Sequence, residues 1–143
     1  MIPVCPKCDV QLLLLHFRAI EVDFCERCRG IWLDAGELEA LLEQRLDRQR
    51  DPVLASLDQD GVVAAGPQHL CPRCDQRLRE ITLSPPGRAA LTLDRCPRGH
   101  GLWFDAEELQ AVLACFPPET GAGKAIKWLN DLFGQPKQGG IIT

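Results

Sequence analysis

Residues 25–38 read CERCRGIWLDAGEL, and residues 96–109 read CPRGHGLWFDAEEL. Both stretches begin with a cysteine, carry a Gly-x-Trp step and end in an acidic segment followed by leucine. A second matching pair lies upstream, CPKCDVQL at 5–12 and CPRCDQRL at 71–78. Internal similarity of this kind indicates one supersecondary unit that occurs more than once. The 143-residue chain therefore contains two copies of one small unit.

Each copy is predicted to consist of a β-hairpin followed by one α-helix. In the first copy the strands are 12–17 and 20–24, because apolar and acidic residues alternate in IEVDF. In the second copy they are 77–83 and 89–94, and the Pro- and Gly-containing SPPGR between them predicts a longer turn.

Helix starts are predicted from an Asp that stands three residues before a Glu, at Asp34 and Glu37 and again at Asp105 and Glu108. This spacing is that of a capping box, in which the Asp side chain caps the helix and the Glu reaches back. The helices are expected to end near Pro52 and near Pro117-Pro118. Their apolar stripes comprise Leu38, Leu41, Leu42 and Leu46 in the first copy, and Leu109, Val112, Leu113 and Phe116 in the second.

The predicted organisation has four parts. Residues 1–51 and 70–118 are the two units, 52–69 is a linker with turn residues and weak periodicity, and 119–143 is a tail. The tail contains a short amphipathic segment at 124–133, which is a candidate helix and a candidate docking element for a partner.

The cysteines of the first copy form two Cys-x-x-Cys pairs, Cys5 with Cys8 and Cys25 with Cys28, separated by the length of a hairpin. Each pair turns two thiolates inward from one tight loop, and the hairpin brings the two loops together. This arrangement is typical of a closed, tetrahedral structural zinc site.

The second copy has only three matching cysteines, Cys71, Cys74 and Cys96, because Gly99 stands where the first copy has Cys28. His100 is the next residue, and imidazole reaches further than a thiol, so a site of three cysteines and one histidine is the favoured interpretation. Two alternatives remain: His69 as the fourth ligand, or a second copy that holds no metal.

Other roles for the cysteines fit less well. The sequence shows no export signal and no apolar run long enough to cross a bilayer, so we expect a cytoplasmic protein, in which disulfides are rare. A redox Cys-x-x-Cys would open a long helix, whereas these pairs precede hairpins. Cys-Pro-x-Cys loops also bind iron in rubredoxins, but a histidine in the second site favours zinc. Cys115 lies among apolar helix residues and is interpreted as a small buried hydrophobe.

The order C-P-x-C, hairpin, C-x-x-C-x-G-I-W-L-D-A-G-E-L over residues 4–46, repeated at 70–116, resembles a mostly bacterial zinc-ribbon family. That family is named for its likeness to the zinc ribbon of transcription factor IIB. The resemblance implies a small metal-dominated α+β fold made of two tandem zinc ribbons, with two Zn²⁺ per chain. By position it implies zinc ligands at Cys5, Cys8, Cys25, Cys28, Cys71, Cys74 and Cys96. A fold shared by many functions does not transfer an activity.

An enzyme is not expected. Asp34, Glu37, Asp105 and Glu108 are explained by helix capping, and a closed four-ligand site leaves no coordination position for water. Trp32 and Trp103, just after the second cysteine loop, are expected to pack each hairpin against its helix.

The net charge helps to choose between the two remaining classes of function, protein binding and nucleic-acid binding. The net charge is -4, and two loaded sites would bring it to about -7, which opposes bulk electrostatic binding of nucleic acid. We therefore predict a non-enzymatic adaptor module that binds a protein partner. The alternative is a nucleic-acid-binding or transcription-associated ribbon that uses the basic residues of the second copy, Arg73, Arg77, Arg79, Arg88, Arg95 and Arg98.

Overall fold

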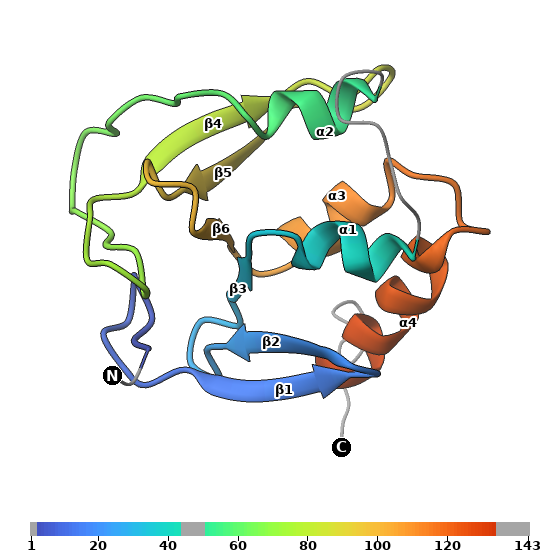
Figure 1. Ribbon diagram of the computed structural model, residues 1–143, viewed down its shortest axis with the longest axis horizontal. Coiled ribbons are helices and arrows are strands. Elements are labelled where there is room, and N and C mark those ends of the chain that lie inside the picture. The colour runs from blue at the N-terminus through green and yellow to red at the C-terminus, as the bar shows by residue number, and fades with distance from the viewer. Residues whose placement is uncertain (1–2, 44–50, 134–143) are drawn as a thin grey trace.

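The computed structural model describes residues 3–43 and 51–133, and its strands form one antiparallel sheet ordered β1-β2-β3-β6-β5-β4 (Figure 1). The strands are β1 (Leu13–Phe17), β2 (Ile20–Phe24), β3 (Ile31–Asp34), β4 (Arg79–Leu83), β5 (Leu91–Arg95) and β6 (Gly101–Phe104). The helices are α1 (Glu37–Leu42), α2 (Pro52–Ser56), α3 (Glu108–Leu113) and α4 (Gly121–Phe133). The predicted α+β class with two zinc ribbons is confirmed.

A third strand in each copy, which we did not predict, joins the two ribbons. β3 pairs with β6 in antiparallel register, with Trp32 opposite Trp103 and Ile31 opposite Phe104. Each of these strands is only four residues long and lies between a cysteine loop and a helix start, so it shows little periodicity of its own. On one side it pairs with a strand of its own copy, β2 or β5, and on the other side with the third strand of the other copy. The two ribbons therefore share one continuous sheet.

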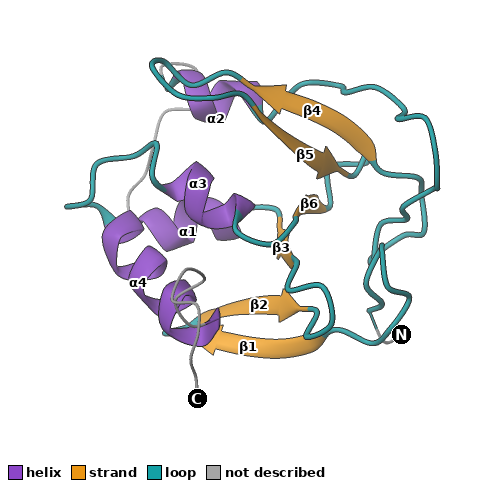
Figure 2. Ribbon diagram, turned by 180° about the vertical axis from the view of Figure 1, so that it is seen from behind, coloured by secondary structure: helices purple, strands orange, loops and turns teal. Residues whose placement is uncertain are grey.

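The helices cover one face of this sheet, and the cysteine loops lie at its opposite side (Figures 1 and 2). The helix side encloses the main apolar core, to which both ribbons contribute. The largest side chains there with no more than 1% exposure include Leu33, Leu41, Phe104, Leu109 and Leu113. Burial of apolar area in this shared core stabilises both copies together.

The tail helix α4 belongs to this core and packs against both α1 and α3. Ala122, Ala125 and Leu129 are fully buried, and a Cβ at Gly121 would lie 2.1 Å from the carbonyl oxygen of Leu41. Trp128 also packs on Phe17 of β1, with ring centroids 5.0 Å apart. The apolar face of the candidate docking element is therefore used inside the molecule.

The segment 52–69, which we predicted to be a linker, begins with a helix. The Asp51 side chain accepts hydrogen bonds from the backbone N–H groups of Val53 and Leu54, and Pro52 occupies the first helical position. Val53 and Leu54 are buried in the shared core. The motif was missed because five helical residues are too few to display a 3.6-residue period. The predicted unit boundaries themselves stay a prediction.

The predicted capping boxes form only in part. Glu37 and Glu108 do reach back, accepting the backbone N–H of Asp34 at 2.7 Å and of Asp105 at 2.8 Å. The two Asp side chains cap no helix; each accepts the indole N–H of the tryptophan two residues earlier. The helices end at Leu42 and Leu113, earlier than predicted, and Leu46 lies outside the described residues.

The same two Asp side chains bind a cation from the other ribbon. Arg73, in the first cysteine loop of the second ribbon, donates to Asp34 at 2.8 Å and also pairs with Asp23 at 2.5 Å. Lys7, at the equivalent place in the first ribbon, pairs with Asp105. Each ribbon's first loop is thus tied to the strand end of its neighbour. This reciprocal arrangement makes Arg73 a structural residue.

Replacing Arg73 by Ala should lower the free energy of unfolding by about 1–2 kcal/mol, because it leaves the Asp23 carboxylate, only 4% exposed, without its cation. Lys7→Ala is the matched change in the other ribbon and should cost less than about 1 kcal/mol, since Asp105 is more exposed. Denaturant unfolding of the metal-saturated variants measures both. Equal losses would show that the burial of Asp23 does not matter.

Candidate metal centres

The cysteine loops are held by local backbone geometry. In three of the loops, the carbonyl oxygen of the first cysteine accepts a hydrogen bond from the backbone N–H of the residue four positions later. That residue is Asp9, Arg29 or Asp75, and its φ is positive, near 60°. In the fourth loop the left-handed residue comes one position earlier, at Gly99, whose φ is 79°. Glycine adopts this conformation without steric penalty. The shift places His100 where it can turn back toward Cys96.

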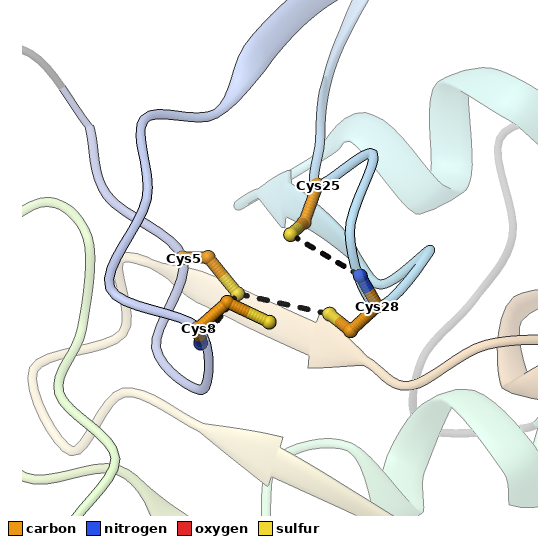
Figure 3. A group of neighbouring side chains, drawn as sticks. All are labelled: Cys5, Cys8, Cys25 and Cys28. Atoms are coloured by element: carbon orange, nitrogen blue, oxygen red, sulfur yellow. Dashed lines mark hydrogen bonds between the residues drawn. The ribbon is translucent and has the colours of Figure 1, made fainter.

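The first centre brings together Cys5, Cys8, Cys25 and Cys28, whose sulfur atoms all lie within 4.8 Å of one another. Figure 3 shows the four side chains converging from two loops. The Sγ atoms of Cys5 and Cys28 are 3.7 Å apart. Four thiolates about 2.3 Å from a tetrahedral zinc would be about 3.8 Å apart, so the group fits the ion.

The second centre brings together Cys71, Cys74, Cys96 and His100 under the same 4.8 Å limit. The Sγ atom of Cys96 lies 3.6 Å from that of Cys74 and 3.5 Å from Nδ1 of His100. Tetrahedral zinc with one imidazole requires a sulfur-nitrogen distance of about 3.6 Å. His69 is not in the group. The geometry thus answers the question left open by Gly99 in favour of His100.

Backbone N–H groups point at the sulfur atoms in both centres. They include those of Cys8 toward Cys5 at 3.3 Å and of Arg73 toward Cys71 at 3.3 Å. Such N–H groups stabilise thiolate charge when a metal is bound, and they orient the ligands before it arrives. Zinc in either centre would be closed by four protein donors and would act as a structural cross-link.

The thiols differ in how readily they ionise. Burial raises the pKa of Cys5 to about 11 and that of Cys71 to about 12. Burial also opposes ionisation of Cys96, but N–H groups of His100 and Arg98 and the neighbouring thiols outweigh it and lower its pKa to about 7. Cys5 and Cys71 must therefore lose a proton when the ion binds, so affinity for zinc should rise with pH.

A second, smaller core surrounds the two centres. It contains four of the ligand cysteines, Leu12, Leu78, Trp32 and Trp103, each of them at most 5% exposed. The indole of Trp103 lies against Gly30 of the first ribbon, and that of Trp32 lies against Gly101 of the second. The tryptophans thus pack between the ribbons on the metal side of the sheet. Our prediction that they pack each hairpin against its helix is wrong, because the third strand turns them to the opposite face.

Cys115, the eighth cysteine, belongs to neither centre. It lies on the helix side, partly buried against the shared core. Its Sγ is 3.5 Å from the carbonyl oxygen of Ala111, one helical turn back.

His100→Ala should lower zinc affinity at the second centre at least tenfold while leaving the first unchanged, because three cysteines alone lack one donor. The matched variant His69→Ala should keep two tightly bound ions per chain. Competitive titration with a chromogenic chelator separates the tight and weak sites. If the His69 variant were the one to lose an ion, the assignment of His100 would be wrong.

The residues beyond the metal ligands were only partly visible in the sequence. Lys7 and Arg73 could have been suspected as a pair, because both occupy the third position of a Cys-Pro-x-Cys loop. Nothing in the sequence showed that each would bind the opposite ribbon.

Comparison with known proteins supports this description. The chain matches the transcription factor zinc-finger family over residues 4–44 and again over 70–114. No curated protein and no solved structure gave a significant match. The two matched segments cover more than half of the chain and contain all eight residues of the two centres. The chain therefore belongs to the transcription factor zinc-finger family, as two tandem ribbons with two zinc sites.

Proposed function

We propose that this chain is a non-enzymatic zinc-binding adaptor whose role is to bind another protein. Both centres offer four protein donors, which leaves a tetrahedral ion no coordination position for water or substrate. Burial raises the pKa of Glu37 to about 7, but this carboxylate accepts the Asp34 N–H and serves the helix start. These features favour a structural use of the metal.

One observation carries the protein-binding proposal: an exposed apolar strand on an acidic ribbon. β1 reads LLLHF, and its Leu13 and Leu14 are 39% and 51% exposed. The ribbon around it, residues 1–43, contains four basic and eight acidic residues. Exposed apolar patches on a protein surface are common sites of protein association. The negative charge of this ribbon, in contrast, repels the phosphates of nucleic acid.

Nucleic acid is the second candidate partner, favoured by the arginines of the second ribbon. Among the residues that the structure describes, two of the six have partners, Arg73 with Asp23 and Asp34, and Arg77 with the carbonyl oxygen of Ala64 at 2.8 Å. Arg79 stands opposite Arg95 in the β4–β5 pair. The basic residues that remain for phosphate contacts are Arg79, Arg88, Arg95 and Arg98.

No helix within the described ranges is long and apolar enough to cross a membrane. We also propose a cytoplasmic location, because seven thiol ligands are best kept reduced there.

Affinity capture with the zinc-loaded, full-length chain tests the two candidates against each other. A protein partner should stay bound after nuclease treatment and should be retained at about 0.3 M salt. Nucleic acid would be lost with nuclease, and its direct binding to DNA or RNA would weaken steeply as salt rises. Capture that depends entirely on nucleic acid would refute the adaptor proposal. The tail must be kept, because α4 fills the shared core.

A further inference from the structure

The two outer edges of the sheet are equivalent by the internal repeat but differ in what covers them. At the β4 edge, Val62 and Glu80 exchange two backbone hydrogen bonds of 2.9 and 2.8 Å. The Gln59 side chain donates to the outward carbonyl oxygen of Thr82 at 2.7 Å. A Cβ at Gly61 would lie 2.8 Å from the Glu80 carbonyl oxygen, so the covering segment approaches closely. An extended Gly-Val segment therefore protects β4.

The β1 edge has no such cover among residues 3–43 and 51–133. Leu13 and Arg79 hold equivalent places, opposite Phe24 and Arg95, so Leu14 corresponds to Glu80 and His16 to Thr82. The backbone N–H and C=O groups of Leu14 and His16 thus point away from β2. No described residue forms a backbone hydrogen bond with them. An uncovered strand edge is a template for pairing with another chain.

The side chains around this edge are also suited to a partner. Leu14, 51% exposed, is on the metal side of the sheet with Asp23 opposite it. A hollow of about 400 Å³ borders the strand there, lined by Leu13, Leu14, Glu21 and other residues. At the β4 edge, the position equivalent to Leu14 is occupied by the charged Glu80, whose side chain is only partly exposed. The β1 edge therefore combines open backbone groups with open apolar surface.

Charge distinguishes between occupants of this edge. Residues 1–43 have a net charge of -4, and a zinc held by four thiolates brings this to about -6. A second copy placed edge to edge would set two such ribbons against each other. A segment with basic residues at its ends would instead be attracted.

We propose that β1 is a β-strand addition site, and that its occupant is an extended segment of a partner protein with Gly and β-branched residues flanked by Lys or Arg. The partner segment pairs with Leu14 and His16 as Val62 pairs with Glu80. Main-chain hydrogen bonds supply affinity, and contact with Leu14 supplies selectivity. This inference rests on the proposed adaptor function and names the surface through which it acts.

Amide hydrogen exchange of the zinc-loaded, full-length chain tests the site directly. In the free protein, the Leu14 and His16 amides should exchange at least tenfold faster than that of Glu80. The probe is a synthetic peptide with the Gly-Val-Val-Ala of residues 61–64 between two lysines on each side. At saturation it should slow exchange at Leu14 at least tenfold, and the same peptide with glutamates should bind at least tenfold more weakly.

Variants separate the edge from the rest of the surface. Leu14→Pro removes an outward N–H that β2 does not use, and proline is tolerated on an edge strand. Leu14→Lys keeps the backbone and adds a repulsive charge. Thr82→Pro, at the place equivalent to His16, removes an outward N–H from the covered β4 edge and serves as the control. Both Leu14 variants should lose at least tenfold in peptide affinity, and Thr82→Pro should bind as the wild type does, with two zinc ions retained in all three.

The outcomes distinguish this site from the adaptor function. Proteins captured equally by the wild type and by Leu14→Lys would leave the adaptor function standing and overturn the β1 site, as would a peptide that fails to protect Leu14. If the Leu14 amide were protected from exchange in the free protein and lost that protection on dilution, the occupant of the β1 edge would be a second copy of the chain. Protection that persists on dilution would assign it to the chain itself. A wild type that captures no protein would refute both proposals.

Discussion

Stripping zinc from both centres should unfold the whole chain, including the helix side that contains no ligand. Structural zinc contributes about 10–16 kcal/mol in small zinc-binding peptides, which exceeds the net stability of most domains. Four ligand cysteines lie in the same core as Trp32 and Trp103, which pack between the ribbons. Loss of the ions therefore loosens the β3–β6 joint that holds the two halves of the main core together.

Chelator titration checks this result with two signals. Far-ultraviolet circular dichroism reports the helices. Tryptophan emission of a Trp128→Phe variant reports the metal side, since the two tryptophans that remain, Trp32 and Trp103, are fully buried there. Both should change over the same range of chelator concentration. Circular dichroism that survives the removal of two ions would contradict the prediction. Two separate steps would show that the ribbons fold independently.

The control for this experiment is Cys115→Ser, which changes a cysteine outside both centres. It should retain two zinc ions and unfold over the same chelator range as the wild type. Cys25→Ser, in contrast, removes a fully buried ligand and should abolish tight binding at the first centre.

Replacing Gly101 by Ala should lower the free energy of unfolding by about 3 kcal/mol or more. A Cβ there would lie 2.2 Å from the Leu33 carbonyl oxygen and 2.7 Å from the Trp32 ring. The first contact is with backbone at the centre of the sheet, which cannot move without breaking the β3–β6 pairing. Overpacking that displaces backbone is among the most destabilising single changes.

Gly87→Ala is the matched control for Gly101→Ala. Gly87 lies in the turn between β4 and β5 with a φ of 70°, and nothing lies within 4 Å of its added Cβ. The left-handed conformation alone costs an alanine about 1–2 kcal/mol. Denaturant unfolding in excess zinc measures both variants. If the Gly101 variant were no less stable than the Gly87 variant, strands β3 and β6 could move apart without loss of stability, and the prediction would be wrong.

The metal centres were readable from the sequence because their determinants are local. A Cys-x-x-Cys loop carries its own geometry, and the repeat showed which loops belong together. Even the substitution at Gly99 was interpretable, since His100 is its neighbour. The hairpin strands were likewise found from alternation and turn residues, with boundaries within two residues of those observed.

The sequence by itself thus determined the two zinc ribbons, their seven cysteine ligands and the hairpin of each copy. The tertiary structure decided how the copies meet. It set the β3–β6 pairing, the ion pairs that Lys7 and Arg73 each form with the other ribbon, and the burial of α4 against both ribbons. Local patterns report which face of a segment is apolar or which group needs a partner. They do not say which distant segment supplies that partner. Asp34 shows this limit, because its spacing from Glu37 predicted a helix cap, whereas a guanidinium 39 residues away was the stronger partner for its carboxylate.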